Sequence, residues 1–411
     1  MSDSKQSPAS TTSAAGPLSG YRILDLTTMV SGPMATLLLG DQGADVIKVE
    51  TTTGGDLTRH LGPQRGGLTA IFVTLNRNKR SLAIDLKSER GREVLLDMMR
   101  DTDVFVQNFR PGAAERMGLD EATLRAIRPD LIYVSISGFG EKGPYANKRV
   151  YDPIIQGLSG LASIQADAEG RPKMVRLIVP DKLTAMTAAQ AITAALLARE
   201  RTGKGQHVRL SMLDAMVSFL WPEGMTAHTL VGDGVGNRKR GSLADLIYET
   251  KDGYITVSTM SDLEWEALAR ATEHEEWITD PRFETAALRM RNFADRRQMV
   301  GETLTERTSA EWLERFEAED VPCAPINTRE DLLVDPQIAE NELIVEMEHP
   351  LAGSVRMTRP AARFDETPTS LRLPAPGLGE QSLEVLEEAG LGAEELAQLQ
   401  EDGVVVQFAA E

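Results

Sequence analysis

Apolar runs alternate with amphipathic helical segments along the first third of the chain. Buried strands are predicted at residues 22–26, 45–50, 81–86, 103–109 and 131–137, and helices at residues 33–40, 89–100 and 121–127. Strands that alternate with helices in this way are typical of a parallel sheet with helices on its faces. The pattern therefore predicts an α/β fold whose ligands bind at the carboxyl ends of the strands.

A second group of elements surrounds Asp181. Residues 174–179 predict a strand that ends at Pro180, and an alanine-rich helix is predicted from Lys182 to Arg201. Asp181 then stands at the helix N-cap, where an aspartate usually serves only to cap the helix. A carboxylate between a strand and a helix is also kept ionised by the helix dipole, close to the edge where ligands bind. Asp181 can therefore cap the helix and also present an ionised carboxylate to a ligand.

The remaining pattern divides the chain into regions. A glycine-rich polar stretch is typical of a linker, residues 246–259 predict a hairpin, helices follow as far as residue 318, and strand character resumes at residues 348–358 before two acidic helices. The predicted organisation is a disordered polar tail (1–17), a large domain (18–222), a linker (223–245), a small domain (246–328), a second linker (329–345) and a C-terminal part (346–411).

The stretch Gly138-x-Gly140-x-x-Gly143 follows a predicted strand and raises the question of a dinucleotide site. A dinucleotide fingerprint needs a helix that begins at its third glycine, because the helix N-terminus holds the pyrophosphate. Pro144 and a polar run follow Gly143 here, and no helical pattern begins before Tyr151. We therefore interpret the stretch as a turn at the end of a strand.

Charge and composition narrow the class of protein. The chain has 411 residues and a net charge of −18, so its mean field repels nucleic acid and anionic membranes. No apolar run is long enough to span a membrane and no secretory signal is recognisable, which predicts a cytoplasmic protein. The single cysteine, Cys323, excludes an internal disulfide, and the five histidines lack metal-site spacing. Basic residues recur between Arg77 and Arg149, where a small anionic ligand is expected.

Seven segments in a fixed order carry a resemblance to a known family. They are DLTTMVSGPMATLLLGDQGADVIKVE (25–50), GGDLTRHLGP (54–63), NRNKRSLAIDLKSERGREVL (76–95), VQNFRPGAAERMGL (106–119), SISGFGEKGPY (135–145), RERTGKGQHVRLSMLDA (199–215) and DPQIAENELIVEMEHPLAG (335–353). From Gly20 to Val405 the chain resembles the class III CoA-transferases, which include formyl-CoA transferase, carnitine CoA-transferase and the α-methylacyl-CoA racemases. The glycine-rich turn resembles the loop that this family carries after a sheet strand.

The resemblance implies a fold and an activity. Members of the family are interlocked homodimers with a Rossmann-like large domain, whose parallel sheet is built from both chain ends, and a smaller α+β domain from the middle of the chain. They move CoA from an acyl-CoA to a small carboxylic acid. Coenzyme A is then a substrate, and no tightly bound cofactor is implied.

The resemblance also implies site residues, position by position. The nucleophile falls on Asp181, whose carboxylate attacks the thioester to give a mixed anhydride and then an aspartyl-CoA thioester. Asp152 and Tyr151 are supporting candidates, although a turn before Pro153 explains Asp152 equally well. Coenzyme A is expected against Met29, Val30, Ser31, Ile84, Lys87, Asn108, Phe109, Arg110, Arg116, Arg149 and Met212. For Met29 and Met212, packing in the core is an equally good interpretation.

Departures from the family pattern bear on the substrate and the reaction. Thr51 stands where formyl-CoA transferases carry an arginine, and their run of active-site glycines is missing from the middle region, so oxalate and formate are not favoured. The alternative activity is that of the racemases, which move a proton between two bases. Racemases carry histidine at the position of Tyr151 and glycines at Lys182-Leu183, so this chain lacks one of the two bases.

Overall fold

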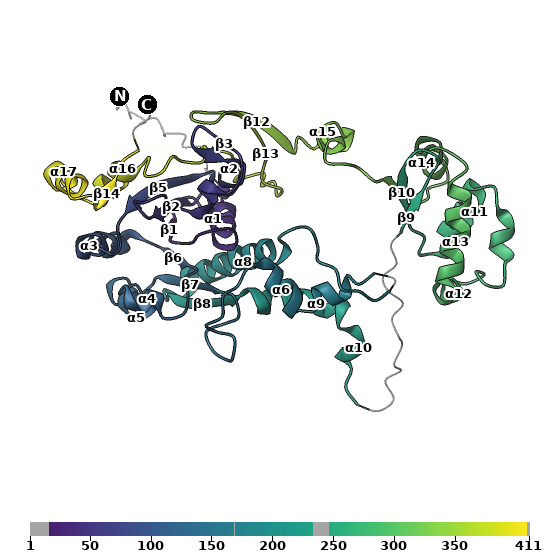
Figure 1. The fold of residues 1–411 in the computed structure, drawn as a ribbon, viewed down its shortest axis with the longest axis horizontal. Coiled ribbons are helices and arrows are strands. Elements are labelled where there is room, and N and C mark those ends of the chain that lie inside the picture. The colour runs from purple at the N-terminus through teal and green to yellow at the C-terminus, as the bar shows by residue number, and fades with distance from the viewer. Residues whose placement is uncertain (1–15, 168, 233–245, 409–411) are drawn as a thin grey trace, which may run out of the picture. The chain divides into compact units, whose positions relative to one another are not determined.

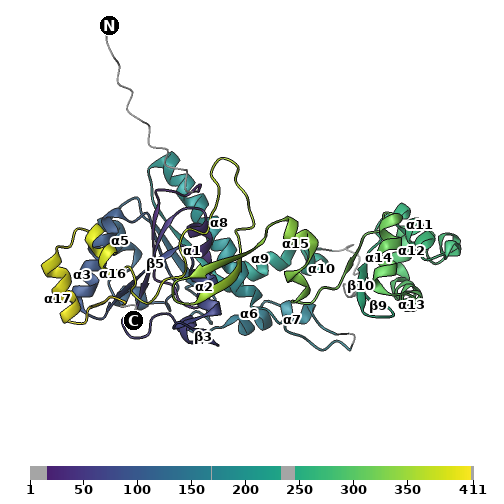
Figure 2. The ribbon, with the colours of Figure 1, turned by 90° about the horizontal axis from the view of Figure 1, so that it is seen from above.

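The computed structural model describes residues 16–167, 169–232 and 246–408. The chain divides into two compact units, one formed by Met1–Val235 with Glu342–Glu411 and the other by Gly236–Asn341. The first unit is a sheet with helices on both faces, and the second is a small sheet with helices (Figures 1 and 2). The predicted polar tail lies outside the described residues, apart from residues 16 and 17.

A seven-stranded sheet organises the first unit. Its strands are β1 (Arg22–Asp25), β2 (Asp45–Glu50), β5 (Lys79–Ile84), β6 (Val104–Gln107), β7 (Ile132–Ser137), β8 (Gln206–Ser211) and β14 (Val405–Val406). They lie in the order β14-β5-β2-β1-β6-β7-β8, and neighbours from β5 to β8 are parallel. The five strands predicted in the first third of the chain are confirmed, and β8 extends their parallel set.

The sheet is mixed, because β14 pairs with β5 in the antiparallel direction. Val406 lies opposite Ala83 in this pairing. The Ser382 hydroxyl strengthens the same edge, since it donates to the Val406 carbonyl at 2.7 Å and accepts the Ala83 N–H at 3.0 Å. The expectation of a parallel sheet is therefore wrong at this edge, where a strand from the C-terminal end of the chain is antiparallel to its neighbour.

Helices cover both faces of the sheet, and apolar side chains alternate between the faces because successive residues of a strand point in opposite directions. Ile23 packs with residues of α1 and α8, whereas Leu24 packs with residues of α3, α5, α16 and α17. The helices of this unit are α1 (Ser31–Asp41), α2 (Ala70–Asn76), α3 (Glu89–Met98), α4 (Ala113–Arg116), α5 (Glu121–Ile127), α6 (Asp152–Leu158), α7 (Leu161–Ile164), α8 (Val179–Thr202), α9 (Met212–Gly224), α10 (Thr226–Thr229), α16 (Ser382–Glu388) and α17 (Ala393–Glu401), with 3₁₀ helices η1 (Leu57–His60) and η2 (Met99–Asp101).

Two hairpins complete the first unit, and the second unit is an α+β arrangement. The hairpins are β3 (Gln64–Arg65) with β4 (Leu68–Thr69) and β12 (Ile344–His349) with β13 (Gly353–Thr358). The second unit contains antiparallel strands β9 (Ile247–Glu249), β10 (Tyr254–Val257) and β11 (Cys323–Pro325), and helices η3 (Glu275–Thr279), α11 (Asp262–Ala271), α12 (Ala286–Arg291), α13 (Phe293–Leu304) and α14 (Ser309–Ala318). Trp265 and Trp312 are buried in its core. The hairpin predicted at residues 246–259 is confirmed.

The two predicted linkers contain some regular structure. Within residues 223–245, α9 continues to Gly224 and α10 follows, whereas residues 233–245 lie outside the described part of the chain. Within residues 329–345, the structure has η4 (Asp331–Leu333), α15 (Pro336–Glu340) and the first residues of β12.

The segment before α8 forms no strand, so the prediction for residues 174–179 is wrong. A side chain satisfies the backbone of this segment in place of a neighbouring strand. The Gln156 amide accepts the Val175 N–H at 2.9 Å and donates to the Leu177 carbonyl at 3.2 Å. The segment therefore crosses the surface of α6 as an irregular connection.

Helix α8 begins earlier than predicted. Its first residue is Val179, and Pro180 fits the first turn because a proline there loses no helical N–H bond. Ile178 is the N-cap, and Asp181 is the third residue of the helix. The predicted N-cap role of Asp181 is therefore wrong, and its carboxyl is available for other contacts.

The glycine-rich turn after β7 leads directly to α6. No helix begins at Gly143, and the next helix starts at Asp152. Gly140 and Gly143 both have φ of 92°, the left-handed region that favours glycine. The interpretation of this stretch as a turn, and not as a dinucleotide fingerprint, is confirmed.

Buried charges join α1 to the sheet. Asp25 at the end of β1 is wholly buried and accepts Lys79 Nζ at 3.0 Å and the Thr36 hydroxyl at 2.6 Å, together with the Thr27 hydroxyl. Burial alone raises the pKa of the Asp25 carboxyl, but Lys79 and Lys48 outweigh burial and hold the pKa below its usual range. Burial lowers the pKa of Lys79 to about 8. The negative charge of Asp25 thus compensates two buried ammonium groups.

Replacing Asp25 with asparagine is expected to destabilise the protein by about 3–5 kcal/mol, because it leaves the buried Lys79 without its carboxylate partner. Since the pKa of Asp25 is lowered on folding, its contribution is complete at neutral pH and is lost as the pH falls through the acid range. Urea unfolding at neutral pH measures the loss. Asp45→Asn is the control, because its pairs with Arg22 and Arg80 are partly exposed and worth about 0–1 kcal/mol. Equal losses in the two variants would contradict this account.

Candidate active site

The loops after β1 and β6 meet at the carboxyl edge of the sheet. These neighbouring strands lead to opposite halves of the sheet, and such a switch point is where α/β proteins bind ligands. Asn108 joins the two loops, since its side chain accepts the Thr28 N–H at 3.1 Å and donates to the Thr28 carbonyl at 2.9 Å. The structure thus brings together predicted CoA contacts from separate parts of the sequence.

The loop after β1 contains a strained residue, Met29. Its φ is 71°, in the left-handed region that residues other than glycine rarely adopt. The Met29 N–H donates to Oδ1 of Asp56 at 3.3 Å. Val30 and Ser31 follow, both buried, as the N-cap and the first residue of α1. Two of the predicted CoA contacts therefore form the start of a helix that is fixed by the protein interior.

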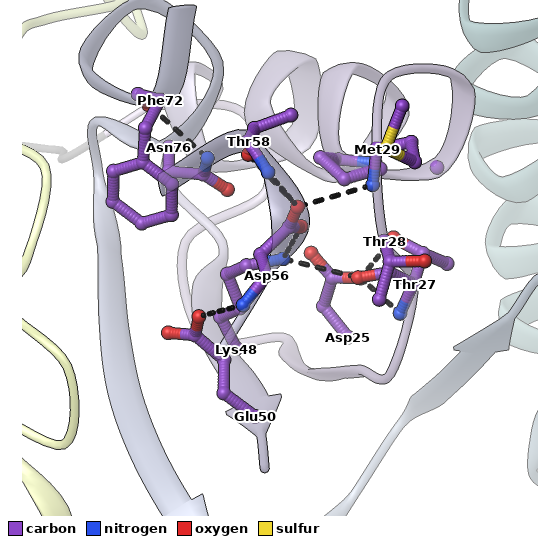
Figure 3. Close-up of polar contacts among 12 residues, drawn as sticks. Asp25, Thr27, Thr28, Met29, Lys48, Glu50, Asp56, Thr58, Phe72 and Asn76 are labelled. Carbon is purple, nitrogen blue, oxygen red and sulfur yellow. Dashed lines mark hydrogen bonds and ion pairs between the residues drawn. The ribbon is translucent and has the colours of Figure 1, made fainter. Parts of the chain in front are cut away.

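A wholly buried ion pair lies beneath this loop. Lys48 Nζ and Asp56 Oδ2 are 2.9 Å apart, and Lys48 also donates to the Thr27 carbonyl at 3.0 Å. Asp56 Oδ1 accepts the N–H groups of both Met29 and Thr58. Figure 3 shows Asp56 between Lys48 and the backbone of Met29. The pair supports the loop from below without reaching the surface.

Asp181 meets Ser31 and Asp152 at the start of α8. The Asp181 N–H donates to Oδ2 of Asp152 at 3.2 Å. The hydroxyl and the backbone N–H of Ser31 lie close enough to the Asp181 carboxyl to lower its pKa. Burial and the neighbouring Asp152 raise the pKa of Asp181 to about 6, although Ser31 opposes the rise. At neutral pH this carboxyl is ionised, half-buried and close to two hydrogen-bond donors. Such a group can act as a nucleophile.

Asp152 is buried and held by its own neighbours. It is the first residue of α6, and its Oδ1 accepts Nε2 of Gln156 at 2.7 Å. Gln156 also binds the backbone before α8, so it links Asp152 to the segment that leads to Asp181. Tyr151, the other supporting candidate, is 65% exposed. Its phenol therefore lies outside this buried network.

The four predicted CoA-binding cations are on the surface. Lys87, Arg110, Arg116 and Arg149 are exposed, and none forms an ion pair with another residue in the described ranges. Arginine and lysine groups without carboxylate partners are well suited to bind phosphates. Their exposure is compatible with the predicted contacts to the phosphate groups of coenzyme A.

The apolar contacts predicted for coenzyme A differ in exposure. Ile84 is buried at the end of β5, and Phe109 is partly buried against the core. Met212 is buried at the start of α9 in a cluster with Ile155 and Met216, so its side chain packs in the core of this unit.

A pocket of about 440 Å³ opens beside Phe109 and Arg110, over the ends of β6, β7 and β8. Inside it, Ser135 Oγ lies 3.3 Å from Gln107 Nε2 and 2.6 Å from His207 Nε2. Its volume is typical of small-molecule sites. A larger hollow of about 570 Å³ beside residues 359–371 contains none of the predicted site residues.

Sequence reasoning missed Lys48, Asp56 and Gln156. A signal was available for Asp56, because Gly54 and Gly55 precede it and both adopt left-handed φ, at 90° and 67°. Two adjacent glycines in a sequence are typical of such a turn. Gln156 gave no comparable signal, because its partners lie in a segment without regular structure.

Two kinds of feature are missing from the part of the chain that the structure describes. No helix there is long and apolar enough to cross a membrane. No group of histidine, cysteine, aspartate and glutamate side chains in the same residues is arranged to hold a metal ion.

Comparisons with known proteins identify the family of this chain. Residues 18–382 match the model of CoA-transferase family III. The chain is 34% identical to the succinyl-CoA:glutarate CoA-transferase of Homo sapiens, over 90% of this chain and 86% of that protein. It is 32% identical to a formyl-CoA:oxalate CoA-transferase of Escherichia coli, over 95% of this chain and 99% of that protein.

A solved structure shares the fold. The CAIB/BAIF family protein from Brucella suis is 31% identical and superposes with a TM-score of 0.79, over 91% of this chain and all of that one. By its sequence and its fold, the chain belongs to CoA-transferase family III.

Proposed function

We propose that this CoA-transferase moves CoA from an acyl-CoA to a carboxylic acid through covalent intermediates on Asp181. The observation that carries the proposal is the half-buried Asp181 carboxyl at the start of α8, beside Asp152 and next to the hydroxyl and N–H of Ser31. Partial burial removes water that otherwise weakens a carboxylate nucleophile, and the raised pKa increases its basicity while leaving it ionised at neutral pH.

The first half of the reaction loads CoA onto the enzyme. An Asp181 carboxylate oxygen attacks the thioester carbonyl carbon, the carbon–sulfur bond breaks, and a mixed anhydride and the CoA thiolate form. The thiolate then attacks the Asp181 carbonyl carbon of the anhydride and releases the donor acid as its carboxylate. The product is an aspartyl-CoA thioester, and no net proton is transferred.

The second half repeats these steps in reverse order with the acceptor acid. Its carboxylate attacks the aspartyl thioester carbon and expels the CoA thiolate, which then attacks the acceptor carbonyl carbon of the new anhydride. Asp181 leaves as a carboxylate. The Ser31 donors lie at the Asp181 carboxyl group, where negative charge develops on oxygen in each attack on that carbon.

The exposed cations account for the binding of CoA in this proposal. Lys87, Arg110, Arg116 and Arg149 would pair with the phosphates of CoA, since charge-assisted bonds to phosphate are among the stronger contacts of protein surfaces. Relatives are named for glutarate and oxalate as acceptor acids. Because Thr51 and the missing glycine run do not favour oxalate, succinyl-CoA with glutarate is the first donor and acceptor pair to test.

Transfer is expected to slow as the pH falls through about 6, because a protonated Asp181 cannot attack the thioester. Asp152→Asn should move this acid limb to lower pH, since it removes the negative charge that helps to raise the pKa of Asp181. Profiles of kcat against pH measure the shift. Asp214→Asn, at an exposed position of α9, should leave the limb in place. An unmoved limb in Asp152→Asn would contradict the assignment.

Asp181 is expected to become covalently modified when acyl-CoA is supplied without an acceptor. Trapping with hydroxylamine followed by mass spectrometry should place the adduct on the peptide that contains Asp181. Asp181→Asn should lack both adduct and transfer, because an amide forms neither the anhydride nor the thioester. Its stability should remain within about 1 kcal/mol of wild type, because the substitution is isosteric and removes a partly buried charge.

Two results would contradict this assignment. An adduct on Asp152, or transfer by Asp181→Asn, would show that another group is the nucleophile. Rapid entry of solvent deuterium at the α-carbon of a 2-methylacyl-CoA, without transfer, would identify the racemase reaction. The exposed phenol of Tyr151 is a poor second base for that reaction at neutral pH.

We also propose that the enzyme is a homodimer. The family resemblance implies it, and large apolar side chains are exposed on the first unit at Ile154 and Leu158 of α6 and at Phe219 and Trp221 of α9. Neighbouring apolar side chains of this kind are typical of association surfaces. Analytical ultracentrifugation at nanomolar concentration should show a dimer, and a fully active monomer would refute the proposal.

A further inference from the structure

The turn between β1 and α1 is held in a conformation that it would not keep by itself. Met29 has φ of 71° without being glycine, and such strain persists only where the surroundings determine the backbone. The two ends of the turn also approach each other closely, at Thr27 and Gly32. A Cβ added at Gly32 would lie 2.2 Å from the Cβ of Thr27.

Two buried charged side chains hold this turn from beneath. Lys48 binds the Thr27 carbonyl at 3.0 Å, Asp56 binds the Met29 N–H at 3.3 Å, and the two side chains pair at 2.9 Å. Asp56 is fixed in turn, because its own N–H donates to Glu50 Oε1 at 2.9 Å. Figure 3 shows these contacts converging on Asp56.

Neither charged group can reach a substrate. The side chains of Lys48 and Asp56 are both 0% exposed, so their contacts are confined to the protein. A buried ion pair is in addition a weak source of stability, since apolar side chains of similar volume often replace one without loss. The Lys48–Asp56 pair therefore contributes mainly through the backbone geometry that it imposes on the turn.

The imposed geometry extends to the nucleophile. Ser31 is only two residues beyond Met29 and is the first residue of α1, which packs against α8 in the core of this unit. Its hydroxyl and N–H lie beside the Asp181 carboxyl and lower the pKa of that group. A change in the turn would move these donors away from Asp181. The charged group that faces Asp181 from α6, Asp152, does not contact the turn and would stay in place.

We propose that Lys48 and Asp56 are positioning residues, which hold the Met29 turn so that Ser31 stays in contact with the nucleophile Asp181. The inference rests on the proposed function of Asp181, and it assigns a role to a charged pair that has no other access to the reaction. Loss of the pair should impair the chemical step more than the binding of acyl-CoA, because the predicted phosphate contacts lie outside the Met29 turn.

The experiment compares Asp56→Asn with Asp41→Asn. Both substitutions are isosteric and break a buried ion pair of the same unit, since Asp41 pairs with Arg77 at 2.7 Å near the far end of α1. In Asp56→Asn, the amide cannot accept from Lys48 and from Met29 through both of its polar atoms, because one of them is now a donor. One of the two contacts is therefore lost.

For Asp56→Asn we expect kcat to fall by about tenfold or more, because small misplacements of reacting groups cost this much. KM for acyl-CoA should rise by a smaller factor, because the predicted phosphate contacts lie outside the Met29 turn. The acid limb of the pH profile should move to higher pH, since the Ser31 donors that lower the pKa of Asp181 move away from it. Asp41→Asn should melt at a lower temperature but keep kcat and the acid limb of wild type. Equal behaviour of the two variants in kcat and in pH profile would overturn the proposal.

A milder variant covers the case in which Asp56→Asn does not fold. Thr58→Val removes only a hydroxyl that binds Asp56 Oδ1 at 2.8 Å, and it should lower kcat less, with KM and the melting temperature nearly unchanged. An unchanged kcat in Thr58→Val would then count against the proposal.

A direct titration of the Asp181 carboxyl distinguishes failure of the proposed function from failure of the positioning role of Lys48 and Asp56. Infrared difference spectra, with the Asp181 band identified by its absence in Asp181→Asn, report the protonation of this carboxyl without any need for activity. If wild type shows no CoA transfer but Asp56→Asn still raises the pKa of Asp181, the proposed function fails and the positioning role stands. If wild type transfers CoA and the pKa of Asp181 does not move, the positioning role fails alone.

Discussion

Charge buried between β1, β2 and β5 is the constraint on which the site depends. Asp25 lies wholly buried against Lys79, and Lys48 pairs with Asp56 a short distance away. Because water cannot solvate these groups, each must remain beside its partner, and the strands and loops that carry them cannot shift independently. The loop from Thr27 to Ser31 is hydrogen-bonded to Lys48 and Asp56 and is therefore held rigidly.

Burial and neighbouring charge also set the pKa of Asp181, but here they raise the pKa instead of lowering it. Here two carboxyl groups lie together, so burial and the negative charge of Asp152 both raise the pKa of Asp181. The Ser31 donors counteract part of this effect, and the balance leaves an ionised group that is poorly hydrated. In the proposed reaction, the Asp181 carboxyl is first the nucleophile and then the thioester carbon, and it needs donors beside it in both states.

Much of the fold followed from local patterns. The strands of the first third of the chain were predicted because their apolar runs are buried on both faces of a parallel sheet, which leaves a strong signal. The strand predicted at residues 174–179 fails because an apolar run does not reveal which groups take up its backbone hydrogen bonds. Gln156 takes them here. The antiparallel β14 was likewise not visible, since its two residues carry too little pattern.

The sequence by itself determined the alternation of strands and helices and the absence of a dinucleotide fingerprint, and its resemblance to a family gave the expectation that Asp181 is the nucleophile. Only the tertiary structure decided that Ser31 and Asp152 contact Asp181, that Asp181 is the third residue of its helix, and that Lys48 and Asp56 support the Met29 turn. The physical reason is that the two kinds of information act over different distances along the chain. Periodicity reports the contacts of neighbouring residues with a shared core, whereas ion pairs and hydrogen bonds between distant segments depend on atomic distances that arise only when the chain has folded.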